Sequence, residues 1–421
     1  MTRQLNILYV GTLPPHPGGS AIVGGQLLEG FTRRGHAVRA LAPVTPATRS
    51  RAAAFDAAHR EIAITRFAIP HFEIPPCFPY PPEYVESERA SVEGGLTALI
   101  AQDRPDAIII GRETYARYVP DLAHASRLPC LLVIHGGITH GIIDGTHSPD
   151  LARQLLTSYR LADLVVTPGE HMAAGLRRLG IAVSVIPNPV DLQRFSPAQD
   201  GAPLRSTLAG VNDVVAMWLG HLRPLKRPLD FVLAAQAALP RDPRLIFVVV
   251  GDGPRKSAMA EACREAGVAG RFRFIDWIEH ADIPAYLNAA DIVVTTTQIE
   301  NQALIYLETQ ACARVLLATD IPAAREVVVD GETGLLFPVG NVAECASKLL
   351  LAAADPELRR TIGRKARTAV ARSHAQEATV AAYEEAIQGL VGRHAPVAGR
   401  PGKPPAKDAL APSRRIFKAC P

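Results

Sequence analysis

The sequence predicts an α/β protein built from two similar halves, each a parallel β-sheet flanked by helices. Short apolar runs alternate with longer amphipathic stretches along the chain, which is typical of parallel-sheet domains. The alternation starts afresh after region 196–205, so the chain is expected to form two Rossmann-like halves joined there. A length of 421 residues and a hydrophobic content of 48% allow two or three domains with real cores.

The elements follow from the apolar runs in order. In the first half the predicted strands are Ile7–Val10, Val38–Ala42, Ala107–Ile110, Leu131–Ile134, Leu164–Val166 and Val183–Ile186. Six prolines in Pro70–Pro82 predict an extended loop. In the second half the predicted strands are Val214–Leu219, Leu245–Val250, Phe272–Phe274, Ile292–Val294 and Val315–Ala318. A last helix is expected over 374–391, and a disordered tail over 393–421.

Composition and charge narrow the class of protein. The net charge of +4 comes from scattered residues, which suits a phosphate-bearing ligand or an anionic membrane surface and is too weak to indicate a nucleic-acid partner, so none is expected. The six cysteines lie far apart without a C-x-x-C pair, so neither a zinc site nor a disulfide framework is predicted. With no signal-peptide core and no apolar run near the ~18 residues of a membrane span, we expect a cytoplasmic protein. Its basic tail is the segment that could touch the inner face of a membrane.

The most informative pair of residues is Glu300 and Glu308, which bracket seven residues just after the predicted strand Ile292–Val294. A helix is expected to begin near Asn301, and eight residues are a little over two turns, so both carboxylates can face one way. That face lies at the carboxyl end of the sheet, where open α/β folds bind ligands and helix starts bind anions. A carboxylate on each side of an anion site suits a nucleotide-sugar.

Other strand ends carry groups of the same chemistry. Adjacent glycines, Gly18 and Gly19, follow the first strand and allow close approach of a ligand to the backbone. His135 stands at the carboxyl end of the strand Leu131–Ile134. The segment from Gly220 to Lys226 contributes basic side chains at a helix start, and Gly251-Asp-Gly-Pro254 repeats the strand–glycine theme. No Asp-x-Asp occurs in the chain, so we expect basic side chains and helix starts, rather than a metal ion, to meet the charge of a diphosphate.

Taken in order, these pieces resemble the retaining glycosyltransferases of family 4, the glycosyl transferases group 1, which have the GT-B fold. The resemblance runs from Ile7 to about Ile387. The segments that carry it are Gly18-Gly19, Arg34-Gly35-His36-Ala-Val38, His135, Ala162-Asp163, Ile186-Pro187-Asn188-Pro-Val-Asp191 with Phe195, Gly220 to Lys226, Gly251 to Pro254, Glu300 to Glu308, and Asp330 to Leu336. The implied fold is two Rossmann-like domains that face each other across a cleft.

The resemblance also implies domains and roles. Residues 1–198 would form an acceptor-binding domain onto which the helix 374–391 packs back, and residues 199–373 a nucleotide-sugar-binding domain. The implied catalytic residues are His135, Glu300 and Lys226. The implied donor-binding residues are His221, Arg223, Gln302, Ala303, Leu304, Glu308, Trp277 and Ile278, with Glu308 on the ribose and Trp277 and Ile278 beside the base. Gly18 and Gly19 would line the acceptor side.

Three positions depart from the family's pattern. His221 stands where an arginine is usual, Asn301-Gln302-Ala303 replaces Gly-Phe-Gly, and Asp276 replaces a glycine before the base-side loop. His221 makes diphosphate binding weaker or pH-sensitive unless Arg223 takes its place, Ala303 limits close approach of the backbone, and Asp276 leaves the base open.

We therefore expect a retaining, metal-independent glycosyltransferase without a cofactor, active in polysaccharide or glycolipid biosynthesis. It would move a sugar from a nucleotide-diphosphate-sugar to a glycan, lipid-linked or small-molecule acceptor. Two alternatives stay open: a nucleotide-sugar epimerase or hydrolase on the same fold, and a non-catalytic nucleotide-sugar-binding protein.

Overall fold

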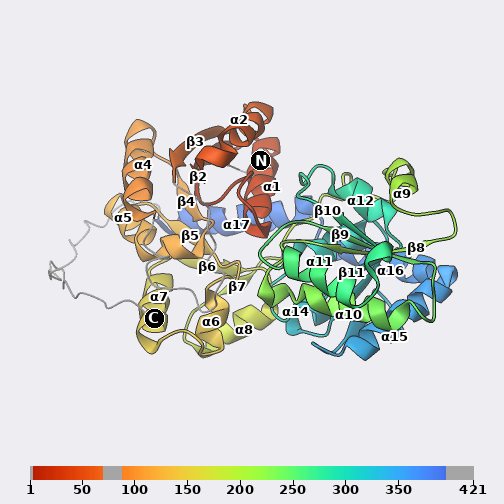
Figure 1. Cartoon of the computed structure of the whole chain (residues 1–421). Coiled ribbons are helices and arrows are strands. Elements are labelled where there is room, and N and C mark those ends of the chain that lie inside the picture. Colours follow the sequence, from red (N-terminus) through yellow and green to blue (C-terminus); the bar gives the residue numbers. More distant parts are fainter. Residues whose placement is uncertain (1–2, 70–87, 395–421) are drawn as a thin grey trace.

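Two parallel sheets, one in each half of the chain, form the framework of the computed structural model (Figure 1). The structure describes residues 3–69 and 88–394. Within these ranges the first sheet has seven strands in the order β3-β2-β1-β4-β5-β6-β7, and the second has six in the order β10-β9-β8-β11-β12-β13. Neighbouring strands pair in parallel throughout both sheets. The predicted α/β class, with two Rossmann-like halves, is confirmed.

Each predicted strand is present, with small changes at its ends. The first sheet consists of β1 Asn6–Val10, β2 Ala37–Val44, β3 Ala63–Ala68, β4 Ala107–Ile110, β5 Cys130–Val133, β6 Leu164–Thr167 and β7 Ser184–Val185. The second consists of β8 Val214–Leu219, β9 Leu245–Val250, β10 Phe272–Ile275, β11 Ile292–Thr295, β12 Val315–Thr319 and β13 Leu335–Phe337. Two strands were not predicted: β3, a partly exposed edge strand with Arg66 in it, and β13, which has three residues.

Helices connect the strands and cover the sheets. Those of the first half are α1 Gly19–Arg33, α2 Arg49–Ala58, α4 Arg89–Gln102, α5 Val119–Ala125, α6 Thr139–Ile143, α7 Pro149–Tyr159 and α8 Glu170–Arg178. Those that follow are α9 Ala202–Leu208, α10 Pro228–Ala238, α11 Lys256–Glu265, α12 Ile283–Ala289, α13 Leu304–Ala311, α14 Pro322–Arg325, α15 Val342–Ala354, α16 Pro356–Ser373 and α17 Gln376–His394. Short 3-10 turns are η1 Pro46–Thr48, η2 Glu113–Arg117, η3 Pro224–Lys226 and η4 Ala269–Arg271.

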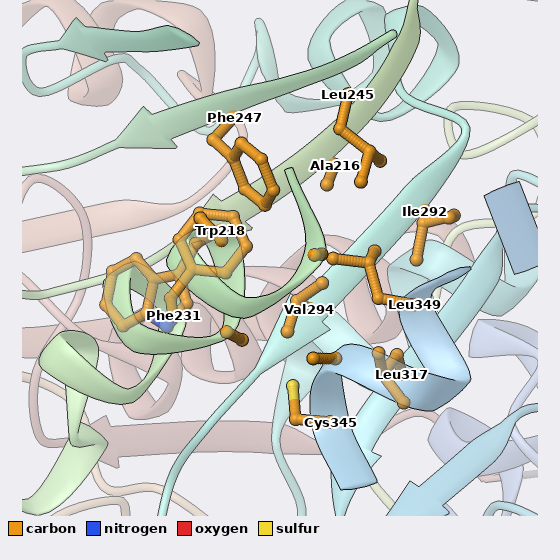
Figure 2. Packing of buried hydrophobic residues seen from close by; sticks show 14 of the residues in the cluster. Ala216, Trp218, Phe231, Leu245, Phe247, Ile292, Val294, Leu317, Cys345 and Leu349 are labelled. Atoms are coloured by element: carbon orange, nitrogen blue, oxygen red, sulfur yellow. The ribbon is translucent and has the colours of Figure 1, made fainter. Parts of the chain in front are cut away.

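The central strands are apolar without interruption because both faces of each sheet are covered. In β1, Leu8 and Val10 belong to the buried cluster on one face, whereas Ile7 and Tyr9 belong to the cluster on the other. Figure 2 shows one face of the second sheet, where the β8 side chains of Ala216 and Trp218 and those of neighbouring strands pack against α10 and α15. This covering leaves the loops at the carboxyl ends of the strands as the exposed places for a site.

Helix α17 returns from the second half and packs on the first sheet (Figure 1). Its residues Val380 and Tyr383 share a buried cluster with β1 and α1, and a Cβ on Gly30 of α1 would overlap the Val380 side chain. Glu384 pairs with Arg34, and its other oxygen lies 3.3 Å from His36 Nε2. The segment Arg34-Gly35-His36 therefore holds the last helix in place.

The predicted domain boundary lies between the two sheets, whereas the predicted proline-rich loop and most of the predicted tail lie outside the described residues. The domain boundary at residue 198 stays a prediction; the strands of the first sheet all precede it and those of the second all follow it. The proline-rich loop 70–82 lies outside the described residues. The predicted start of the disordered tail at residue 393 is wrong, because Arg393 and His394 belong to the last turn of α17, and the rest of the tail lies outside the described residues. In the described part of the chain, no helix combines the length and apolar character needed to cross a membrane.

Candidate active site

A cleft of about 1010 Å³ lies between the carboxyl ends of the two sheets, lined by the loops that follow β1, β4 and β5 of the first sheet and β8 to β11 of the second. The residues predicted for the site all line this cleft: Gly18, Gly19, His135, His221, Arg223, Lys226, Trp277, Ile278, Glu300, Gln302, Ala303, Leu304 and Glu308. The structure therefore brings the predicted set together, while the role of each member stays a prediction.

His135 enters the cleft from the end of β5 on a loop that Glu113 holds. The Glu113 carboxylate accepts hydrogen bonds from the backbone N–H groups of Gly136, Gly137 (3.1 Å) and Thr139 (3.1 Å), and from the Thr139 hydroxyl (2.7 Å). Burial raises the pKa of Glu113, and the hydrogen bonds to Thr139 and the loop oppose that shift. Burial lowers the pKa of His135 to about 4, so its imidazole is neutral near pH 7. Glu113 was not predicted as a site residue, because it lies far from His135 in the chain.

The glycine loop of the first half faces the start of α13 in the second. Gly18 adopts φ +114°, a conformation that favours glycine, and precedes the first turn of α1. A Cβ on Gly19 would lie 3.6 Å from Leu304 Cδ1, so the two helix starts meet across the cleft. A ligand bound at one start therefore borders the other.

Glycines also fix the basic loop after β8. Gly251 adopts φ +133°, and a Cβ there would overlap the carbonyl oxygen of Gly220. Leu222 N–H donates to Asp252 O (2.9 Å) and Arg255 N–H donates to Leu222 O (2.9 Å). The loops after β8 and β9 are thus joined backbone to backbone, which sets the directions of the neighbouring basic residues.

Three of those basic residues reach the cleft: His221, Arg223 and Lys226. Burial lowers the pKa of His221, and the positive charges of Arg223 and Lys226 lower it further, against an opposing effect of Asp252. Lys226 forms an ion pair with Glu300, although separate ligand contacts were predicted for the two residues. An anion that binds Lys226 must therefore share it with Glu300 or displace that carboxylate.

Helix α13 begins at Leu304, so the expectation of a helix from Asn301 is wrong. Glu300 lies in the loop before the helix and only Glu308 lies on it, hence the two glutamates do not share a helical face. The first N–H groups of α13, those of Leu304 and Ile305, have no acceptor within the helix and lie beside the cleft. The loop conformation is set by contacts with the first half, which local sequence does not encode.

Glu308 is buried, and its partner is His280 from the loop after β10. His280 Nε2 lies 2.6 Å from Glu308 Oε1, and the imidazole ring lies 5.4 Å from the Phe195 ring. Trp277 in the same loop is 46% exposed, and Arg51 from α2 lies over it at 5.8 Å while pairing with Glu279 at 2.7 Å. Neither His280 nor Arg51 was predicted as a site residue, because no local motif marks them.

Comparison with known families gives two adjacent matches. Residues 17–194 match the family described as Glycosyltransferase Family 4, and residues 205–369 match the one described as Glycosyl transferases group 1. The D-inositol 3-phosphate glycosyltransferase of Kribbella flavida is 32% identical over 224 residues, 49% of this chain and 51% of that protein. The enzyme of the same name from Actinosynnema mirum is 34% identical over 190 residues, 43% of this chain and 45% of that protein. The chain spans about half the length of the curated relatives it matches.

Solved structures show the same fold at low sequence identity. The crystal structure of Anabaena HepE with UDP-glucose has a TM-score of 0.75 and 18% identity, covering 92% of this chain and 100% of that one. The sucrose-phosphate synthase of Thermosynechococcus elongatus has a TM-score of 0.76 and 19% identity over the same shares. The two-domain fold is therefore that of these two structures.

Proposed function

This chain belongs to family 4 of the GT-B glycosyltransferases, and we propose that it is a retaining enzyme that moves a sugar from a nucleotide-diphosphate-sugar to an acceptor hydroxyl without a metal ion. The observation that carries this proposal is the placement of two paired glutamates around the start of α13. Glu300 with Lys226 lies on one side of that helix start, and Glu308 with His280 lies farther along the helix.

A nucleotide-sugar matches this arrangement from end to end. The diphosphate would contact Lys226 and the N–H groups of Leu304 and Ile305, because a cation and a helix start both favour negative charge. Glu308 would accept hydrogen bonds from the ribose hydroxyls, and Glu300 would turn from Lys226 toward hydroxyls of the sugar. The base would lie beside Trp277 and Ile278, which line the same cleft.

The proposed reaction breaks the bond between the sugar C1 and the diphosphate oxygen, which keeps the electron pair. Lys226, with His221 or Arg223, would stabilise the charge that develops on this leaving group. An acceptor hydroxyl entering beside Gly18 and Gly19 would attack C1 on the face that the diphosphate leaves, and its proton would pass to a diphosphate oxygen. Neutral His135 can donate one hydrogen bond to the sugar at this point.

The charges that the chain supplies support the proposed metal independence. Transferases that hold a diphosphate through a divalent ion use carboxylate oxygens as ligands, and this chain has no Asp-x-Asp for that purpose. The cleft instead offers Lys226, Arg223 and, when protonated, His221 at the place where the diphosphate would lie.

The ligands named for similar proteins give the order in which candidate donors and acceptors should be tested. One structural neighbour binds UDP-glucose, so UDP-sugars come first in a thermal-shift panel that also includes GDP- and ADP-sugars. The curated relatives are named for D-inositol 3-phosphate, so polyol phosphates come first among the acceptors, before glycans and lipid-linked sugars.

The test is transfer of labelled sugar in the presence of EDTA, with product analysis. We expect a glycosylated acceptor and little donor breakdown when acceptor is left out. Rapid conversion of the donor without acceptor would favour the epimerase or hydrolase, and tight donor binding without turnover across broad acceptor mixtures would favour a binding protein.

A further inference from the structure

The loop that carries Glu300 is hydrogen-bonded to the opposite half of the molecule through Asn301. The Asn301 side chain is 4% exposed, and its Nδ2 donates to the carbonyl oxygen of Ile134 (3.1 Å) and to the hydroxyl of Thr167 (2.9 Å). The Thr167 hydroxyl itself donates to the Ile134 carbonyl (3.0 Å). One amide from the second half thus joins a buried network at the ends of β5 and β6 in the first.

The residues on either side of Asn301 are held from the same half. His171 Nε2 lies 3.2 Å from the carbonyl oxygen of Glu300. The Gln302 side chain accepts from Asn188 N–H (2.7 Å) and donates to Pro168 O (3.2 Å). Contacts with the first half therefore fix the positions of three consecutive residues of the second, Glu300, Asn301 and Gln302.

The packing around Asn301 leaves it little freedom. A Cβ on Gly136 would lie 2.8 Å from Asn301 Cβ, and a Cβ on Gly169 would lie 2.6 Å from Asn301 Oδ1. Glycine at both positions gives the room that the asparagine side chain fills. The amide is consequently fixed by shape as well as by its hydrogen bonds.

The network lies between two residues of the proposed site. Ile134, whose carbonyl accepts the hydrogen bond, directly precedes His135, and Asn301 directly follows Glu300. The glycine and phenylalanine that the family resemblance leads one to expect at positions 301 and 302 have no side-chain donor for these carbonyls. The connection is therefore a property of this chain's own residues.

We propose that Asn301 is a positioning residue that keeps Glu300 in register with His135, so that both reach the same donor sugar from opposite halves. This inference rests on the proposed transferase function. Glu308 lies outside the network, and Lys226 is linked to it through the ion pair with Glu300 that a bound diphosphate is proposed to replace, so loss of Asn301 should lower the catalytic rate and leave nucleotide binding nearly unchanged.

The main variant is Asn301→Ala, and its matched control is Asn288→Ala. Asn288 is a buried asparagine of the same half that is 7% exposed and bonded to Ser196 O (2.9 Å) and Pro284 O (2.9 Å), and it lies outside the cleft. Both changes remove a buried amide, so both should lower Tm. Since misplacement by about 1 Å can cost ~100-fold in rate, we expect Asn301→Ala to lower kcat about 10- to 100-fold with an unchanged Kd for the nucleoside diphosphate. Asn288→Ala should keep kcat within about twofold, the scatter expected of distant independent sites.

A second pair of variants tests the network from the other half. Thr167→Val removes the hydroxyl that bonds to Asn301 and Ile134, whereas Thr167→Ser keeps it. We expect the valine variant to lower kcat and the serine variant to restore it. In the double variant Asn301→Ala/Thr167→Val, the loss should be less than the product of the two single losses because both act through one network.

Hydrogen exchange gives a measurement that does not need turnover. In Asn301→Ala, the amides of residues 134–139 should lose protection although the change lies in the other half, and in Asn288→Ala they should not. An unchanged kcat in Asn301→Ala, an equal loss in Asn288→Ala, or unchanged exchange at 134–139 would overturn the inference. If the wild type transfers no sugar from any donor, the proposed function fails, and the exchange result still decides whether the connection across the cleft exists.

Discussion

Replacing Glu308 by alanine is the most direct test of how the cleft recognises its ligand. In the structure Glu308 is buried and its carboxylate lies 2.6 Å from His280 Nε2. The alanine variant removes the acceptor proposed for the ribose and leaves His280 without this partner. We expect weaker binding of the nucleoside diphosphate together with a lower Tm.

The expected loss of affinity in the alanine variant follows from the kind of contact that it removes. A hydrogen bond to a charged group contributes about 1.5–3 kcal/mol, and every 1.4 kcal/mol changes Kd tenfold. Glu308→Ala should therefore raise the Kd for the nucleoside diphosphate about 10- to 150-fold. Glu308→Gln keeps an acceptor for His280 and has nearly the same volume, so its effect should be smaller on both affinity and Tm.

Isothermal titration with a nucleoside diphosphate at one pH and one salt concentration measures this effect, and circular dichroism checks the fold. Glu300→Ala is the control. It frees Lys226 from its ion pair, so nucleoside diphosphate binding should stay equal or tighten while turnover falls. A Kd for Glu308→Ala within twofold of the wild type would remove the ribose contact from the proposal.

The remaining predictions concern the pH dependence of donor binding, the metal requirement of the reaction, and the contact between the loops after β8 and β9. Because burial and nearby cations lower the pKa of free His221 and a bound diphosphate would raise it, donor affinity should be highest at low pH and fall as pH rises through the pKa of the complex. Donor Kd against pH should become flat in His221→Arg, and superimposable curves for the two proteins would exclude His221 as a phosphate ligand. Activity should survive EDTA with the anomeric configuration of the donor kept in the product; loss in chelator that magnesium or manganese restores would contradict metal independence. Gly251→Ala should cost about 1–3 kcal/mol of unfolding free energy, because its Cβ would overlap the Gly220 carbonyl, whereas Gly270→Ala, with open space around it, should change Tm little; equal Tm values would refute this reason for the glycine.

Much of the fold could be predicted because parallel strands covered on both faces are continuous apolar runs. The runs at Leu245–Val250 and Val315–Ala318, for example, are β9 and β12 with at most one residue changed at an end. The strand β3 escaped prediction because it is half exposed at the sheet edge, and β13 because three residues give no period. Both are stabilised by pairing with a neighbouring strand rather than by their own pattern.

The sequence by itself did not reveal Arg51, Glu113 or His280, which line the cleft. It did determine that the predicted site residues gather there, since βα loops at the carboxyl ends of parallel strands meet at one edge of each sheet. It did not determine which of them pair. Lys226 with Glu300 and His280 with Glu308 are separated by 74 and 28 residues, distances over which no helical or strand period operates. The start of α13 was misplaced for the same reason. Asn301 is held by Ile134 and Thr167 of the other half, so the loop takes its shape from contacts that exist only once the two sheets face each other.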